Sequence, residues 1–96
     1  MNNDELIRKL NSVGKRAFVE NYLLFQRYAV GTISKEEAID QLMELGVSNE
    51  AGASIRLSNA KLIFENSRNK VALALIIESQ NLPHNISKEA KTLLEV

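Results

Sequence analysis

The feature that most constrains the fold is a run of seven consecutive apolar residues, Val71 to Ile77, within the stretch NKVALALIIES. A helix that is apolar on every side must be covered on every side, because any exposed face would lose hydrophobic free energy. The run is too short to span a bilayer, which needs about 20 apolar residues. We therefore expect a buried helix over 69–80 at the centre of the fold.

The rest of the chain is predicted to form helices separated by short turns. Apolar residues recur at helical spacing, and no alternation of period two persists, so no strand is expected. The other helices are expected over 4–12, 15–30, 35–45, 49–66 and 88–95. The chain thus predicts one all-α domain, residues 1–96, folded as a compact globular bundle of five or six helices around the helix at 69–80.

Capping residues mark several of the predicted helix starts. Ser34 and Glu37 have the spacing of a capping box, in which each side chain binds a free backbone amide of the first turn. Ser48 or Asn49 is expected to cap the helix at 49–66, and Ser87 is expected to cap the last helix. Such a cap contributes about 1 kcal/mol to stability.

Composition argues against several kinds of site. The chain has no cysteine and a single histidine, His84, which rules out the usual zinc ligand sets. No nucleophile motif, glycine-rich phosphate loop or acid pair in an apolar setting occurs. We therefore expect no enzyme activity, no metal and no cofactor. Charges occupy the N-terminal segment where a signal peptide would need an apolar core, so a cytoplasmic protein without a membrane segment is expected.

Charge is balanced overall but unevenly distributed. Twelve Lys/Arg match twelve Asp/Glu, whereas residues 32–50 carry a net charge of −4 and residues 51–77 a net charge of +3. The helix at 49–66 has apolar residues on two faces, so Arg56 and Asn59 are expected to be partly buried. A buried arginine needs a carboxylate or carbonyl partner. One interpretation pairs Arg56 with an acid of the preceding helix. The other makes it part of a basic patch for an acidic partner, and the candidate partner-binding residues are Arg56, Asn59, Lys61, Arg68 and Lys70.

The helix at 15–30 has more apolar surface than the remaining helices are expected to cover, which predicts an interface with a protein partner or a second copy of the chain. The leading hypothesis is a non-enzymatic protein-binding module, such as a small inhibitor, immunity-type or adaptor protein. The short chain and the helix start GTISKEE resemble small helical bacterial immunity proteins over about twenty residues. This resemblance implies a bacterial origin and transfers no site.

The alternative hypothesis is a nucleic-acid-binding regulator. Residues 35–66 have the outline of a helix-turn-helix, with Gly46, Val47 and Ser48 in the turn. The start of the second helix, however, offers Glu50 and no basic residue before Arg56. Phosphate contacts supply much of the affinity for DNA, so nucleic acid is the less favoured partner.

Overall fold

The computed structural model describes all 96 residues and contains seven α-helices and no strand. The helices are α1 (Asn3–Val13), α2 (Lys15–Glu20), α3 (Tyr22–Ala29), α4 (Lys35–Glu44), α5 (Glu50–Glu65), α6 (Asn69–Glu78) and α7 (His84–Glu95). The expected all-α bundle is therefore confirmed, with one helix more than the upper estimate. None of the seven helices combines the length and the apolar character needed to cross a membrane.

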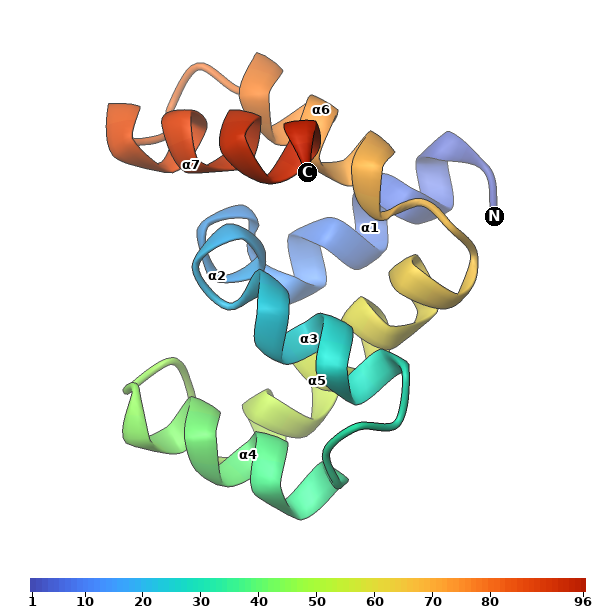
Figure 1. The fold of residues 1–96 in the computed structure, drawn as a ribbon, viewed down its shortest axis with the longest axis vertical. Helices are drawn as coiled ribbons and strands as arrows, with labels where there is room; N and C mark the ends of the chain where they lie inside the picture. Colours follow the sequence, from blue (N-terminus) through green and yellow to red (C-terminus); the bar gives the residue numbers. More distant parts are fainter.

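The helix around which the others are arranged is α5. Helices α1, α3 and α4 pack directly on it, whereas α6 packs mainly on α7. Figure 1 shows α6 and α7 side by side at one end of the molecule, α4 at the other end and α5 between them. As expected, the apolar residues of α6 are all buried or half-buried. The central position nevertheless belongs to α5, which is the longest helix and has fully buried alanines, Ala53 and Ala60, that let neighbouring helices approach closely.

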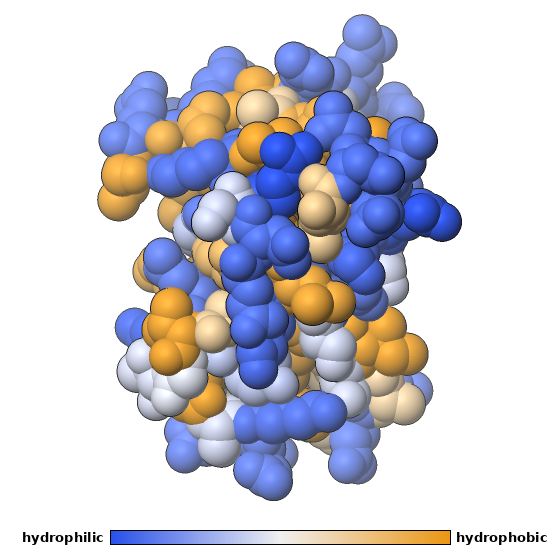
Figure 2. All heavy atoms as spheres, turned by 90° about the vertical axis from the view of Figure 1, so that its right-hand side faces the viewer, coloured by the Kyte–Doolittle hydropathy of each residue, from blue (hydrophilic) through white to orange (hydrophobic).

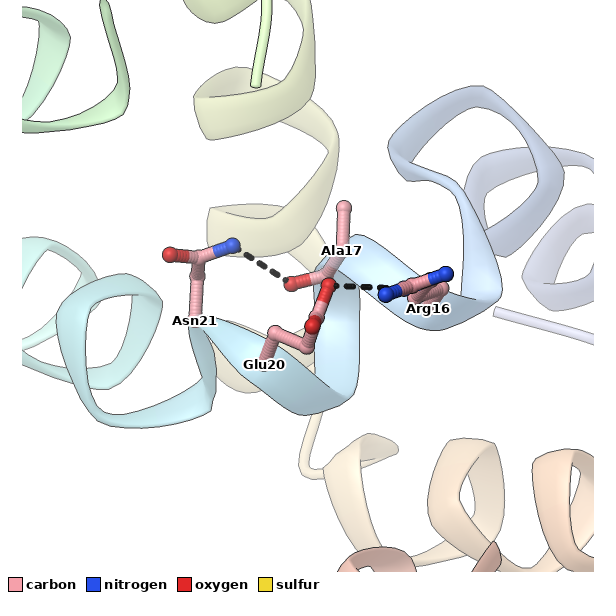
Figure 3. Close-up of polar contacts among 4 residues, drawn as sticks. All are labelled: Arg16, Ala17, Glu20 and Asn21. Atoms are coloured by element: carbon pink, nitrogen blue, oxygen red, sulfur yellow. Dashed lines mark hydrogen bonds and ion pairs between the residues drawn. The ribbon is translucent and has the colours of Figure 1, made fainter. Parts of the chain in front are cut away.

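The single helix expected over 15–30 is divided at Asn21. The backbone of Asn21 leaves helical geometry, with φ −117° and ψ 23°. Its buried side-chain amide donates to the carbonyl oxygen of Ala17 at 3.1 Å (Figure 3). Asparagine favours helix ends and turns because its side chain competes for backbone hydrogen bonds in this way. The chain therefore changes direction here, and Figure 1 shows α2 almost end-on where α3 lies across the view.

Four of the five aromatic residues form one cluster in the core. Phe18 of α2 packs against Tyr22 and Phe25 of α3 and Phe64 of α5, with ring centroids 5.6, 6.2 and 5.9 Å away. Edge and offset contacts of this kind add to the free energy gained by burying the rings. The hydroxyl of Tyr22 accepts a hydrogen bond from the side-chain amide of Asn69 at 2.8 Å, which ties α3 to α6. The rings of Phe18 before the bend and of Tyr22 after it thus both reach Phe64 of α5.

The predicted caps are largely confirmed. Ser34 accepts a hydrogen bond from the Glu37 amide at 3.1 Å, and Asn49 accepts one from the Gly52 amide at 2.8 Å. The reciprocal half of the capping box, from the Ser34 amide to the Glu37 carboxylate, does not form. The prediction for Ser87 was wrong, because α7 begins at His84 without a side-chain cap. The carbonyl of the preceding Pro83 accepts hydrogen bonds from the Ile86 and Ser87 amides, so the first turn forms four residues earlier than predicted.

Candidate protein interface

Arg56 does not form the ion pair with the preceding helix that was one interpretation of the sequence. Its Nη1 donates to the carbonyl oxygen of Val13, the last residue of α1. Carbonyls at a helix C-terminus lack partners within the helix and carry the negative end of its dipole, so they suit a cation. Arg56 therefore caps α1, and it passes so close to Gly14 that a side chain there would meet its guanidinium at 2.9 Å.

Two further candidate residues also hold α1 in place. The side-chain amide of Asn59 donates to Ser12 Oγ at 3.1 Å, and Arg68 Nη2 donates to Asn3 Oδ1. Together with Arg56, they connect α5 and the start of α6 to both ends of α1. The expected partial burial of Arg56 and Asn59 is confirmed.

The two lysines among the candidates contact other helices. Lys61 lies over the ring of Tyr28 in α3, with Nζ 5.4 Å from the ring centroid. Lys70 donates to three carbonyl oxygens at the end of α7, those of Leu93, Leu94 and Val96, at 2.6–3.2 Å. The five candidates thus reach three different helices, and every one has a contact within the chain. Their role in partner binding stays a prediction.

The acidic residues of α4 lie on its exposed face and form no ion pair with α5, although the two helices are in contact. The ion pair of the structure joins Arg16 and Glu20 on α2, at 3.1 Å (Figure 3). The acidic segment 32–50 and the basic segment 51–77 are therefore neighbours in the fold, but their charged side chains are solvated and do not pair with each other. A helix-turn-helix would present the exposed face of α5 to DNA. This face carries no cation at its exposed positions Glu50, Ala51, Ile55, Ser58, Leu62 and Glu65.

The largest hollow of the molecule, with a volume of about 820 Å³, lies beside α2. It is bordered by the start of α2, the α4–α5 turn and the α6–α7 connection, which Figure 1 shows around α2 on the left of the view. Lys15, Arg16 and Arg56 contribute positive charge, and Glu20 contributes the single carboxylate. Three cations and one acid leave a local net charge of +2 in a chain whose overall charge is zero.

Two smaller hollows, of about 170 and 140 Å³, continue this surface along the bend between α2 and α3. The first shares Glu20 and Leu45 with the large hollow, and the second shares Tyr22, Leu23 and Leu93 with the first. We call the three together the α2 trough. Leu23 and Leu45 border it with 58% and 65% of their surface exposed. The trough is therefore cationic at one end and apolar further along.

Sequence reasoning anticipated only part of this surface. It expected excess apolar area on the helix at 15–30, and Leu23 and Val30 are indeed exposed. It did not select Lys15, Arg16 or Leu45. The sequence signal for the cationic end of the trough was the basic pair directly after the helix break at Gly14. The residues near this pair do not reveal that the distant turns 45–47 and 79–82 surround it.

Comparisons of the chain with protein families, curated proteins and solved structures found no match. No cluster of His, Cys, Asp and Glu side chains could hold a metal ion. Figure 2 shows the side facing the right of Figure 1, which is mostly hydrophilic with separate hydrophobic spots. The geometry of the surface is accordingly the basis for a functional proposal.

Proposed function

We propose that this chain is a cytoplasmic, non-enzymatic protein-binding module, of the small inhibitor, immunity-type or adaptor kind, that binds its partner through the α2 trough. The observation that carries the proposal is the exposure of Leu23 and Leu45, two large apolar side chains that line the same hollow. Large apolar side chains that border a concave surface are what a protein partner covers, because their burial supplies the free energy of association.

The arrangement of the fold supports this choice of surface. The buried Asn21 fixes the bend between α2 and α3, and helical spacing places the exposed Leu23 on the opposite side of α3 from the buried Phe25. Interfaces built on rigid elements lose less conformational entropy on binding than interfaces on mobile loops. The trough is backed by the aromatic cluster, so it is a preformed surface rather than one that must be assembled.

The test is affinity capture from the native host with three forms of the protein. The variant Leu23→Glu/Leu45→Glu places two charges in the trough. The control Ile55→Glu/Leu62→Glu makes the same change at exposed positions of α5. We expect a protein captured by the wild type and the control but reduced at least about tenfold with the trough variant, since buried hot-spot residues dominate affinity. Equal capture by all three forms would contradict the proposal.

The same variants distinguish a second copy of the chain from a different partner. Light scattering coupled to size exclusion at micromolar concentration would show a dimer that the trough variant dissociates, if the partner is another copy. Duplex DNA binding that weakens steeply with salt would instead favour the nucleic-acid regulator.

A further inference from the structure

The cationic end of the α2 trough has hydrogen-bond donors that the fold does not use. Arg16 is 61% exposed, and only its Nε is bound, to Glu20. The two terminal nitrogens of its guanidinium are therefore available for a bidentate contact with a carboxylate. Lys15 makes a single long contact, from Nζ to Ser79 Oγ at 3.4 Å. Arg56 also lines the hollow and adds its charge there while it caps α1.

Apolar side chains lie next to these donors. Leu45, Val47 and Leu82 line the same large hollow, and Leu45 also lines the next hollow, together with Leu23. A ligand long enough to cover the whole trough would contact the cations at one end and the apolar side chains further along. A small inorganic anion would use only the first part, whereas a peptide segment would use both.

We infer that the partner segment bound in the α2 trough is an acidic peptide segment, with Asp or Glu side chains against Lys15 and Arg16 followed by large apolar side chains against Leu45 and Leu23. This inference rests on the proposed function and adds the chemistry of the partner. It follows from charge complementarity, since the local net charge of +2 is balanced by nothing else in the hollow. Further along, Glu89 lines the second hollow, and Lys70 lines the third with its Nζ already bound to the end of α7. Next to Glu89, the apolar part of the segment is expected to be free of acids.

The experiment is a peptide-display selection on the folded full chain. Random 12-residue peptides are selected on the wild type, and the selected peptides are synthesised with a fluorescent label. Their dissociation constants are measured by fluorescence anisotropy for three proteins: the wild type, Lys15→Glu/Arg16→Glu, and the control Arg8→Glu/Lys9→Glu. The control reverses two charges beside a separate hollow of α1, so its change in net charge is identical. Circular dichroism confirms that both variants are folded.

We expect the selected peptides to combine two or more Asp or Glu with nearby Leu, Ile, Met or Phe. Their affinity should fall about tenfold or more for Lys15→Glu/Arg16→Glu and at most about twofold for the control, and the loss should shrink at high salt. Failure to select peptides, peptides without acids, or equal binding to all three proteins would overturn the inference. RNA or DNA binding that requires Lys15 and Arg16 would also overturn it, because the hollow would then serve nucleic acid.

The outcomes separate this inference from the function on which it rests. If Leu23→Glu/Leu45→Glu abolishes capture of a native partner while the charge reversal at Lys15 and Arg16 does not, the trough is a protein interface with a partner of other chemistry. If no native partner depends on the leucines, the protein-binding function itself fails.

Discussion

Replacing Ser67 by glycine is expected to raise the free energy of unfolding. Ser67 has φ +57° and is the only non-glycine residue with a positive φ. It follows α5, where the Arg68 amide donates to the Ile63 carbonyl at 2.9 Å and so closes a Schellman motif. Helix α3 ends with the same bond pattern, but with Gly31 at the left-handed position, φ +81°. The two sites therefore differ in the residue that occupies the same backbone conformation.

The change in the free energy of unfolding for Ser67→Gly is the difference between two opposing contributions. The left-handed conformation costs an L-residue about 1–2 kcal/mol, which glycine does not incur. Glycine, in turn, loses about 0.5–1 kcal/mol through the greater freedom of its unfolded chain. The net gain for Ser67→Gly is about 0.5–1 kcal/mol, or about 3–6 °C in Tm for a domain of this size. Thermal and urea unfolding monitored by circular dichroism would measure it.

Gly31→Ser is the inverse substitution and serves as the matched control. A side chain at Gly31 would meet no atom within 4 Å, so its cost is conformational and not steric. We expect Gly31→Ser to lower the free energy of unfolding by about the amount that Ser67→Gly raises it. The double variant should then be as stable as the wild type, because the effects of substitutions at distant sites are additive. A destabilised Ser67→Gly protein would refute the reasoning.

Three further substitutions test the packing and the caps by the same unfolding measurements. Leu57→Ala removes a fully buried side chain of the central helix and should cost about 2–5 kcal/mol, whereas a cost below about 1 kcal/mol would contradict the central position of α5. Asn49→Ala removes the cap of α5 and should cost about 1 kcal/mol, while Asn49→Asp should retain most of it. Arg56→Met keeps most of the side-chain volume but removes the bond to Val13, with an expected cost of about 1–3 kcal/mol; unchanged stability would show that α1 does not need this cap.

Local features of the fold were predictable because their causes are local. The caps at Ser34 and Asn49 depend on residues three positions apart, and the helix stop at Gly31 depends on the backbone freedom of one residue. The start of α7 was mispredicted because two signals competed, a serine suited to capping and a proline four residues before it. The proline determined the start, since its carbonyl already accepts the amides of the first turn.

The arrangement of the helices was less predictable, because it depends on size and contact geometry more than on apolar content. The sequence of α6 is the most apolar, yet a helix of ten residues reaches fewer neighbours than the sixteen residues of α5. The bend at Asn21 was overlooked because an asparagine on the surface of a long helix would have the same sequence signature. Its burial and its bond to Ala17 are set by the tertiary fold.

The contacts of the cations explain why the residues selected from the sequence cover only part of the α2 trough. Arg56 was selected because its helix has apolar residues on two faces, and Lys70 was selected as part of a basic patch. Both donate to carbonyls at the ends of α1 and α7, where a cation stabilises the fold. Lys15 and Arg16 lie in the first turn of α2, where free backbone amides already provide positive potential. Apart from the bonds of Arg16 to Glu20 and of Lys15 to Ser79, these two charges make no side-chain contact within the fold, and they are the two that the inference of an acidic partner segment uses.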